Sequence, residues 1–357
     1  MVKILNDLRI ESFQDNLLSW YSEQRRDLPW RQSRDPYKVW VSEVMLQQTR
    51  VDTVIPYFQR FIEKFPTLEA LADADEESVL KAWEGLGYYS RARNLQSAVR
   101  EVKEKYGGKV PDSEKEMRSL KGVGSYTAGA VLSIAYNKPV PAVDGNVMRV
   151  LSRVLLIEEE ITKATTRKMM EQAARALIPD DAAADFNQAL MELGAIVCTP
   201  KDPGCLICPV QNECRALKEG MQNLLPKKTK KRPPKLVHIA VAVMRDQNGK
   251  FLIQKRPNRG LLANLWEFPN CESEKDNDEQ AQLQQFLRKH YKSEAVIDEH
   301  VMHFEHIFSH VKWKLNVYRG RFQEIVHEKE NIRLVEAGQL ARFPFSVSHQ
   351  KIIQQMI

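Results

Sequence analysis

A basic, proline-containing segment divides this chain into two parts whose hydrophobic periodicities differ. Residues 227–235, KKTKKRPPK, carry six basic side chains and two prolines without any acid, so they cannot pack a core and are typical of a linker. Upstream, apolar residues recur every three or four positions, which is the period of an α-helix. Downstream, segments such as LVHIAVAVM are typical of strands. The two parts must therefore belong to different fold classes.

We predict a multidomain chain with an all-α domain over residues 1–221, a basic linker over 222–235 and an α/β domain over 236–357. Helical periodicity is seen at 13–26, 35–48, 75–86, 90–106 and 166–178. The second part offers strands at 236–244, 250–256 and 310–322, and helices near 279–291 and 347–356. A length of 357 residues suffices for two domains, because one domain takes roughly 150 residues.

Composition excludes some classes of protein. The sequence has neither an apolar run of membrane-spanning length nor a signal-peptide core at its start, so we expect a cytoplasmic protein without a membrane partner. A net charge of +6 permits a polyanionic partner without requiring one. Four of the five cysteines fall between residues 198 and 214, which does not suit a disulfide framework in a cytosolic chain.

A glycine-spaced hairpin, SLKGVGSYTAGAV, joins two predicted helices at residues 119–131. Ser113 begins a capping box for the first helix, and Ser125 is placed to cap the second. Between the helices, Gly122 and Gly124 permit unusual backbone angles and leave their amides uncovered. Bare amides beside a helix N-terminus favour an anion such as phosphate, although a plain tight turn would show the same pattern.

The clustered cysteines predict a metal centre. Cys198, Cys205, Cys208 and Cys214 are separated by six, two and five residues. Zinc favours two C-x-x-C pairs on separate knuckles, whereas this loop has one pair and fits a 4Fe–4S cluster better. Zinc stays open on spacing alone. Cys271 stands apart and is interpreted as a core residue.

In combination, LKGVGSYT, VPAVDGNVMRV and the C-x6-C-x2-C-x5-C loop resemble the helix-hairpin-helix DNA glycosylases of the endonuclease III superfamily, over roughly residues 8–221. The resemblance implies that the hairpin at 119–127 grips a DNA phosphate through Ser119, Gly122 and Gly124. It further implies that the loop at 198–214 holds a 4Fe–4S cluster.

Tyr126 distinguishes between branches of that superfamily. The bifunctional, pyrimidine-damage members carry a lysine at this position, and its amine forms a Schiff base with the sugar. A phenol cannot form an imine, so we expect base removal without strand cleavage. Tyr126 and the segment WVSEVMLQQT resemble the adenine-specific glycosylases of the MutY family, which act on adenine opposite 8-oxoguanine. We therefore expect a member of that family from a bacterium.

Two carboxyl groups are candidates for the chemistry. Glu43 has Val39, Trp40 and Leu46 within a turn, so burial should raise its pKa and let it carry a proton; a solvated glutamate is the plain alternative. Asp144 precedes VMRVLSRVL and could simply be a helix N-cap. The resemblance makes Glu43 the proton donor to adenine.

The same resemblance makes Asp144 the group that stabilises the oxocarbenium-like sugar, as an ion pair or through a transient bond. Tyr126 would support that charge, and Asn146 would help to hold the carboxylate.

Adenine must leave the base stack before it can react. The resemblance implies an adenine pocket and DNA contacts formed by Arg26, Trp30, Arg31, Gln48, Thr49, Leu86, Gly87, Tyr88 and Arg91. Leu86 and Tyr88 would be tips that wedge between base steps, and Arg91 would meet a phosphate. Trp30 could equally be core, and Arg93 is interpreted as part of a solvated helix face.

The second part resembles the Nudix fold but lacks the R-E-x-x-E-E pattern that binds magnesium beside pyrophosphate, so we expect no phosphohydrolase activity. EHIFSHVKW resembles a loop that reads 8-oxoguanine, which assigns this role to Phe308, Ser309 and His310; a plain β-turn is the alternative.

These observations predict a monomeric enzyme of base excision repair whose partner is double-stranded DNA containing adenine opposite 8-oxoguanine or guanine. Two other functions stay open. One is a bifunctional glycosylase/AP lyase of the endonuclease III type. The other is a DNA-binding protein with a metal loop and no catalysis.

Overall fold

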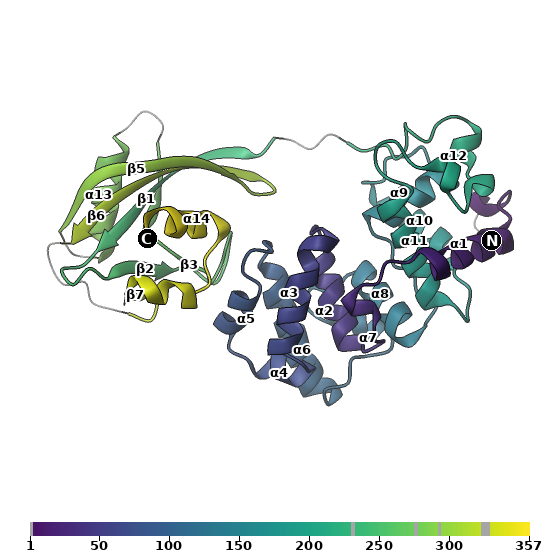
Figure 1. Cartoon of the computed structure of the whole chain (residues 1–357), viewed down its shortest axis with the longest axis horizontal. Helices are drawn as coiled ribbons and strands as arrows, with labels where there is room; N and C mark the ends of the chain where they lie inside the picture. Colours follow the sequence, from purple (N-terminus) through teal and green to yellow (C-terminus); the bar gives the residue numbers. More distant parts are fainter. Residues whose placement is uncertain (1–2, 230–232, 275–277, 292–293, 323–328) are drawn as a thin grey trace. The chain divides into compact units, whose positions relative to one another are not determined.

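The computed structural model describes residues 3–229, 233–274, 278–291, 294–322 and 329–357, and it separates into two compact units (Figure 1). The first unit comprises Met1–Asp73 and Asn94–Lys230, and the second comprises Ala74–Arg93 and Lys231–Ile357. Within the described part of the chain, no helix is both long and apolar enough to cross a membrane.

Helices make up the first unit. Their bounds are α1 (Ile10–Gln24), α2 (Pro36–Leu46), α3 (Val51–Lys64), α4 (Leu68–Asp73), α6 (Ser90–Tyr106, whose first turn belongs to the second unit), α7 (Glu114–Ser119), α8 (Ser125–Tyr136), α9 (Gly145–Val154), α10 (Ala164–Leu177), α11 (Ala183–Ile196) and α12 (Arg215–Lys218). Helix α11 packs against α1, α8 and α9, and α2 packs against α8. The apolar faces of α1, α9, α10 and α11 share one core, which includes Phe13, Val150 and Leu190.

Gly129 lets α8 lie close to the segment that precedes α9. A Cβ atom added to Gly129 would overlap the carbonyl oxygen of Pro141, so only glycine fits at this point of the helix. This close approach fixes the path of residues 141–144 and therefore the start of α9. Gly129 thus helps to position the side chain at residue 144.

The second unit contains helix α5 (Glu76–Ala82) and a mixed seven-stranded sheet. The strands are β1 (Lys235–Arg245), β2 (Phe251–Lys255), β3 (Trp266–Glu267), β4 (Asn270–Ser273), β5 (Ala295–Ile307), β6 (Val311–Phe322) and β7 (Ile332–Val335). Their order is β3-β2-β1-β6-β5, with β4 paired to β1 and β7 paired to β2. Strands β1 and β6 are parallel and the other pairs are antiparallel, so the predicted combination of an all-α and an α/β part is confirmed.

Helices cover both faces of this sheet. Alternate residues of β1 face opposite sides, as the period of a strand requires. Ile239 and Val241 pack with Ile352 of α14 (Val347–Met356). Ala240 and Ala242 pack with α13 (Glu279–Tyr291) on the other face. The helices predicted at 279–291 and 347–356 are therefore the two layers that enclose the sheet.

The segment predicted as a linker is partly packed. Leu225 is only 2% exposed, and its carbonyl oxygen accepts a hydrogen bond of 3.0 Å from Arg153 Nε. The carbonyl oxygen of Lys227 accepts another from the backbone N–H of Ile161, at 3.2 Å. The reason is that basic side chains begin only at 227, whereas the three residues before them, at 224–226, are apolar. Residues 230–232 lie outside the described part.

Candidate active site

Many of the side chains named from the sequence line one pocket in the first unit. They are Arg26, Trp30, Arg31, Glu43, Thr49, Tyr126, Asp144 and Asn146. They come from the segment after α1 (Arg26), from a short 3-10 helix (Pro29–Arg31), from α2 and the turn after it, and from the N-terminal ends of α8 and α9. Residues separated by more than a hundred positions in sequence are thus brought to one place.

Glu43 is a buried acid on an apolar helix. Helix α2 begins at the N-cap Asp35 and buries Glu43 to 4% exposure. Tyr126 Oη donates a hydrogen bond to Glu43 Oε2. Burial is the largest influence and raises the pKa of Glu43 to about 7, with Asp144 adding to the rise while Tyr126 and Arg31 oppose it. The carboxyl group can therefore hold a proton at neutral pH.

Tyr126 is the second residue of α8 and supplies a neutral hydroxyl to this pocket. Burial, followed by the negative charges of Glu43 and Asp144, raises the pKa of its phenol well above the usual range. Its Oη also lies 3.6 Å from Met191 Sδ. A protonated phenol at this position can donate a hydrogen bond but cannot act as an amine nucleophile.

Asp144 is the N-cap of α9, as the plain interpretation of its sequence position suggested. Its Oδ1 accepts hydrogen bonds from the backbone N–H groups of Asn146 (2.9 Å) and Val147 (2.8 Å), and its Oδ2 accepts one from Asn146 Nδ2 (3.0 Å). Burial, the largest influence, raises the pKa of Asp144, while these hydrogen bonds and the charge of Arg149 lower it. The cap therefore fixes the orientation of a carboxylate that also lines the pocket.

A chain of hydrogen bonds continues from Asp144 towards the cysteine loop. Asn146 Oδ1 accepts from Arg149 Nη2 at 2.9 Å, and Arg149 Nη2 also donates to the carbonyl oxygen of Gly194 at 2.6 Å. Arg149 Nε donates to the carbonyl oxygen of Cys198 at 2.7 Å. The positions of Asp144 and of the cysteine loop are thus linked through Asn146 and Arg149.

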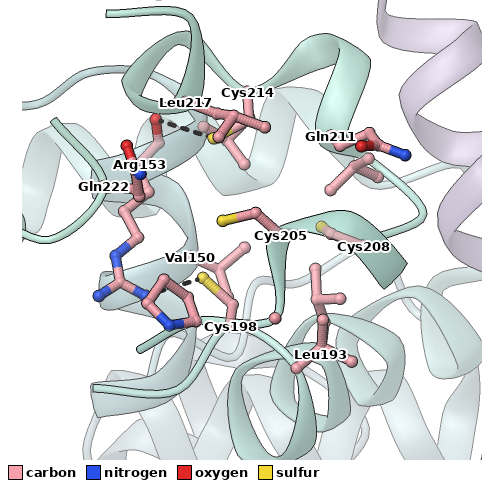
Figure 2. Close-up of a pocket in the computed structure, with 15 residues that line it drawn as sticks. Val150, Arg153, Leu193, Cys198, Cys205, Cys208, Gln211, Cys214, Leu217 and Gln222 are labelled. Carbon is pink, nitrogen blue, oxygen red and sulfur yellow. Dashed lines mark hydrogen bonds between the residues drawn. The ribbon is translucent and has the colours of Figure 1, made fainter. Parts of the chain in front are cut away.

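The four cysteines named from the sequence surround a second pocket, which Figure 2 shows. They lie after α11 (Cys198), in a 3-10 turn (Cys205–Ile207), beyond that turn (Cys208) and at the N-cap of α12 (Cys214). Arg153 Nη1 donates to Cys198 Sγ at 3.2 Å. In the residues that the structure describes, no three His, Cys, Asp or Glu side chains form a group that could hold a single metal ion.

The hairpin agrees with its sequence interpretation in part. Ser113 caps α7 as predicted, because its Oγ accepts from the backbone N–H of Glu116 at 3.3 Å, and the same hydroxyl donates to Glu116 Oε2 at 2.6 Å. Gly122 has a φ of +77°, in the left-handed region, whereas Gly124 has a φ of −91° that any residue can adopt. The prediction that Ser125 caps α8 is wrong. Gly124 occupies the N-cap, and Ser125 Oγ donates to Glu171 Oε1 at 2.8 Å.

Two further predicted DNA-contact residues, Ser119 and Gln48, lie at or just beyond the ends of helices. Ser119 is the last residue of α7, and its Oγ donates to the carbonyl oxygen of Glu116 at 2.7 Å. Gln48 follows α2 with a φ of +61°, a conformation that is uncommon for a residue other than glycine. Thr49 comes next and lines the active-site pocket. Strained backbone of this kind is concentrated at functional sites.

In the second unit, six of the predicted residues line a common pocket. Leu86, Gly87 and Tyr88 line it from the segment after α5, and Phe308, Ser309 and His310 line it from the turn between β5 and β6. Ser309 and His310 are exposed, whereas Phe308 packs edge-on against Trp313 with ring centroids 4.9 Å apart.

The loop beside α5 places its side chains differently from the sequence prediction. Tyr88 has a φ of +45° and is 43% exposed, but Leu86 is only 6% exposed and is not an exposed tip. Arg91 is 9% exposed, and its Nη2 donates to the carbonyl oxygens of Leu86 and Gly87, both at 3.2 Å. Arg93, predicted to be solvated, donates to the carbonyl oxygen of Asn258 at 3.2 Å.

Helix α11 contributes pocket residues that the sequence reasoning missed. Gln188, Met191 and Glu192 line the same pocket as Glu43. Glu192 is 1% exposed and lies in an apolar stretch, ALMELGAIV. Like Glu43, Glu192 is an acid surrounded by apolar residues in the sequence, so the same pattern predicts its burial.

Known families match both parts of the chain. The model of the HhH-GPD superfamily of base excision DNA repair proteins matches residues 41–178, and that of the NUDIX domain matches residues 240–355. Among solved structures, a thermostable thymine-DNA glycosylase is 30% identical with a TM-score of 0.54, covering 59% of this chain and 97% of that one. An endonuclease III in a non-covalent DNA complex is 25% identical with a TM-score of 0.51, covering 62% and 100%.

Curated relatives extend the match over both units. The adenine DNA glycosylase of Mus musculus is 39% identical over 87% of this chain and 70% of its own length. That of Homo sapiens is 38% identical, covering 87% and 67%, and that of Buchnera aphidicola subsp. Schizaphis graminum is 35% identical, covering 85% and 86%. Extensive identity of this kind, over a helical unit and a Nudix-like unit together, places the chain in the adenine DNA glycosylase family.

Proposed function

We propose that this protein is a monofunctional glycosylase that removes adenine paired with 8-oxoguanine or guanine from double-stranded DNA and leaves the strand intact. The observation that carries this proposal is one pocket holding a protonatable glutamate, a helix-capping aspartate and a tyrosine. It occurs in a chain of the adenine DNA glycosylase family. Two carboxyl groups with different protonation states are what hydrolysis of a glycosidic bond requires.

Glu43 delivers the proton. Adenine is a poor leaving group as an anion, so protonation of the purine must accompany cleavage of its bond to the sugar. Burial keeps Glu43 protonated up to about pH 7, and the hydroxyl of Tyr126 holds the carboxyl group in a defined orientation. General acids of this kind act best when their pKa lies near the working pH.

Asp144 stabilises the positive charge that develops on the sugar. Its hydrogen bonds to the amides at the start of α9 and to Asn146 leave the carboxylate preorganised before the bond breaks. Tyr126 adds its dipole to the same pocket. No amine occupies the position of Tyr126, so a Schiff base with the sugar cannot form there.

The flipped adenine occupies the pocket beside Arg26, Trp30 and Arg31. Trp30 is 6% exposed and packs edge-on against Phe58, which gives the pocket one rigid wall. We assign the DNA backbone to the hairpin at 119–127, whose amides near Ser119, Gly122 and Gly124 can bind a phosphate. Gln48 and Thr49 contact the duplex where adenine has left it.

We assign recognition of the opposite 8-oxoguanine to the second unit. Phe308, Ser309 and His310 line a pocket together with Leu86, Gly87 and Tyr88. Exposed hydroxyl and imidazole groups can hydrogen-bond a base edge, and Tyr88 offers an exposed ring for stacking. Helix α13 has a single acidic residue, Glu279, which supports the prediction that this unit does not hydrolyse nucleotides.

The four cysteines fit a 4Fe–4S cluster. Four thiolates are the usual ligands of such a cluster, and here all four line one largely apolar pocket. When bound, the cluster would cross-link the end of α11 to α12 through iron–thiolate bonds. Arg153 would meet one of its ligands, Cys198.

Replacing a predicted ligand should remove the cluster. We expect Cys205→Ser and Cys208→Ser to purify without the brown colour of the parent protein and with less iron and acid-labile sulfide. Cys271→Ser is the control, because Cys271 lies on β4 in the other unit and should leave the iron content unchanged. A colourless parent protein that contains zinc would contradict the assignment.

The proposal extends to the assembly, the location and the domain bounds of the protein. We propose that the protein acts as a monomer on DNA in the bacterial cytoplasm, with a glycosylase domain at 1–221, a linker at 222–235 and a recognition domain at 236–357.

The proposed function is tested by measuring free adenine released from a duplex with one adenine opposite 8-oxoguanine. A duplex of the same sequence with adenine opposite thymine is the control. Release from the first duplex and not from the second is the expected result. Binding to both duplexes without release would favour a DNA-binding protein without catalysis.

A further inference from the structure

Glu192 of α11 is a buried carboxylate in the adenine pocket that the mechanism above leaves unused. Its side chain is 1% exposed and receives four hydrogen bonds from two arginines. Oε1 accepts from the backbone N–H (3.1 Å) and Nε (2.7 Å) of Arg26, and Oε2 accepts from Arg26 Nη2 (2.9 Å) and Arg31 Nη2 (2.8 Å). One carboxylate thus joins both arginines that we assign to the adenine pocket.

Arg31 is held from two further directions. Its Nη1 donates to the carbonyl oxygen of Arg26 at 3.0 Å, and its guanidinium lies over the ring of Tyr21, 5.5 Å from the centroid. With these contacts, Glu192 leaves Arg31 little freedom to rotate. Guanidinium groups held by several hydrogen bonds present their remaining donors in a fixed direction.

We propose that Glu192 is a positioning residue, whose carboxylate holds Arg26 and Arg31 at the wall of the adenine pocket and balances their positive charge. The inference rests on the proposed function, because it assigns Glu192 a part in that reaction. A carboxylate removed from water is retained in a folded protein when hydrogen bonds and opposite charges compensate it, and here both arginines do so.

The charge of Glu192 is present at all working pH values. Burial alone would raise its pKa, but the hydrogen bonds from Arg26 and Arg31 outweigh burial and lower it to about 2. Without this carboxylate, two guanidinium groups would face the pocket with no negative charge between them.

Glu43 is the group that would respond. It faces Tyr126 of α8, Asp144 at the start of α9 and Arg31 of the 3-10 helix, and the charge of Arg31 lowers its pKa. The carboxylate of Glu192, on α11, offsets that positive charge, because its Oε2 lies 2.8 Å from Arg31 Nη2. Neutralising Glu192 should therefore make Glu43 lose its proton at a lower pH.

The test is the pH dependence of the single-turnover rate of adenine excision in Glu192→Gln. Glutamine keeps the shape and one acceptor oxygen but removes the charge. We expect the alkaline limb of the profile to move to lower pH by about one unit. Glu267→Gln is the matched control, because Glu267 is also buried and paired with Arg256 but lies in the other unit. Its profile should not move.

Arg31→Gln keeps the test decisive if Glu192→Gln does not fold. Removing the positive charge should let Glu43 keep its proton longer, so the alkaline limb should move to higher pH. Limbs that stay in place, or that move in the same direction in both variants, would overturn the inference. Failure of the parent protein to release adenine would instead overturn the proposed function, so the two failures are distinguishable.

Discussion

Glu43→Gln should slow adenine excision by about 10²- to 10⁴-fold, the range expected when a general acid is removed. Glutamine has the shape of the acid and can still accept the hydrogen bond from Tyr126, but it has no proton to give to the purine. The parent protein should itself lose activity above about pH 7, as Glu43 ionises. Single-turnover rates measured over a range of pH check both expectations.

The Glu43→Gln variant should lose activity but gain folding stability above pH 7. Because burial raises the pKa of Glu43 from 4.5 to about 7, the unfolded chain ionises first as the pH rises, and the folded state loses stability between these two values. Above pH 7 the penalty is about 3 kcal/mol at 1.36 kcal/mol per pKa unit. Glu43→Gln removes it, so the variant should unfold at a higher temperature than the parent at pH 8.

A matched control is available on the neighbouring helix. Glu63 is exposed on α3, so Glu63→Gln should change neither excision nor unfolding temperature appreciably. A Glu43→Gln variant that keeps its activity within tenfold of the parent would remove Glu43 from the role of proton donor.

Asp144→Asn should reduce excision by about 10³-fold, because the pocket loses the negative charge that opposes the sugar cation. Asparagine caps helices as well as aspartate does, so its Oδ1 can still accept from the amides of Asn146 and Val147. The free energy of unfolding should therefore fall by less than about 1 kcal/mol. Rate and stability measured on the same preparation separate the two roles of this residue.

Asp35→Asn is the matched control, because it makes the same substitution at another helix N-cap. Asp35 caps α2 in the same unit and accepts from the amides of Tyr37 (2.8 Å) and Lys38 (3.4 Å). It should tolerate the change in both stability and activity. Equal losses of activity in the two variants would show that Asp144 matters only as a helix cap.

The sequence predicts helices correctly where hydrophobic periodicity and burial coincide. The helices at Ser90–Tyr106, Glu279–Tyr291 and Val347–Met356 end where their hydrophobic pattern ends. Strand β5 was missed because it is half exposed and rich in charged and histidine residues, AVIDEHVMHFEHI, so no clean alternation marks it. Its partner β6, with more buried positions, was identified.

For the site, local chemistry predicted the acid but not its surroundings. Glu43 stands out because apolar residues flank it on its own helix. Glu192 fulfils the same condition, but its pairing with Arg26 and Arg31 spans more than 160 positions and depends on how α11 packs. The burial of Arg91 and Leu86 differs from the prediction for a related reason, since a loop between glycines gives no sequence sign of which side chains turn inward.

The most direct test of the central claim uses an end-labelled duplex with one adenine opposite 8-oxoguanine, incubated with the protein and analysed with and without hot alkali. Removal of the base without lyase chemistry predicts strand breaks only after alkali, because Tyr126 offers no amine to the sugar. Strand breaks without alkali would contradict the account and identify a bifunctional enzyme.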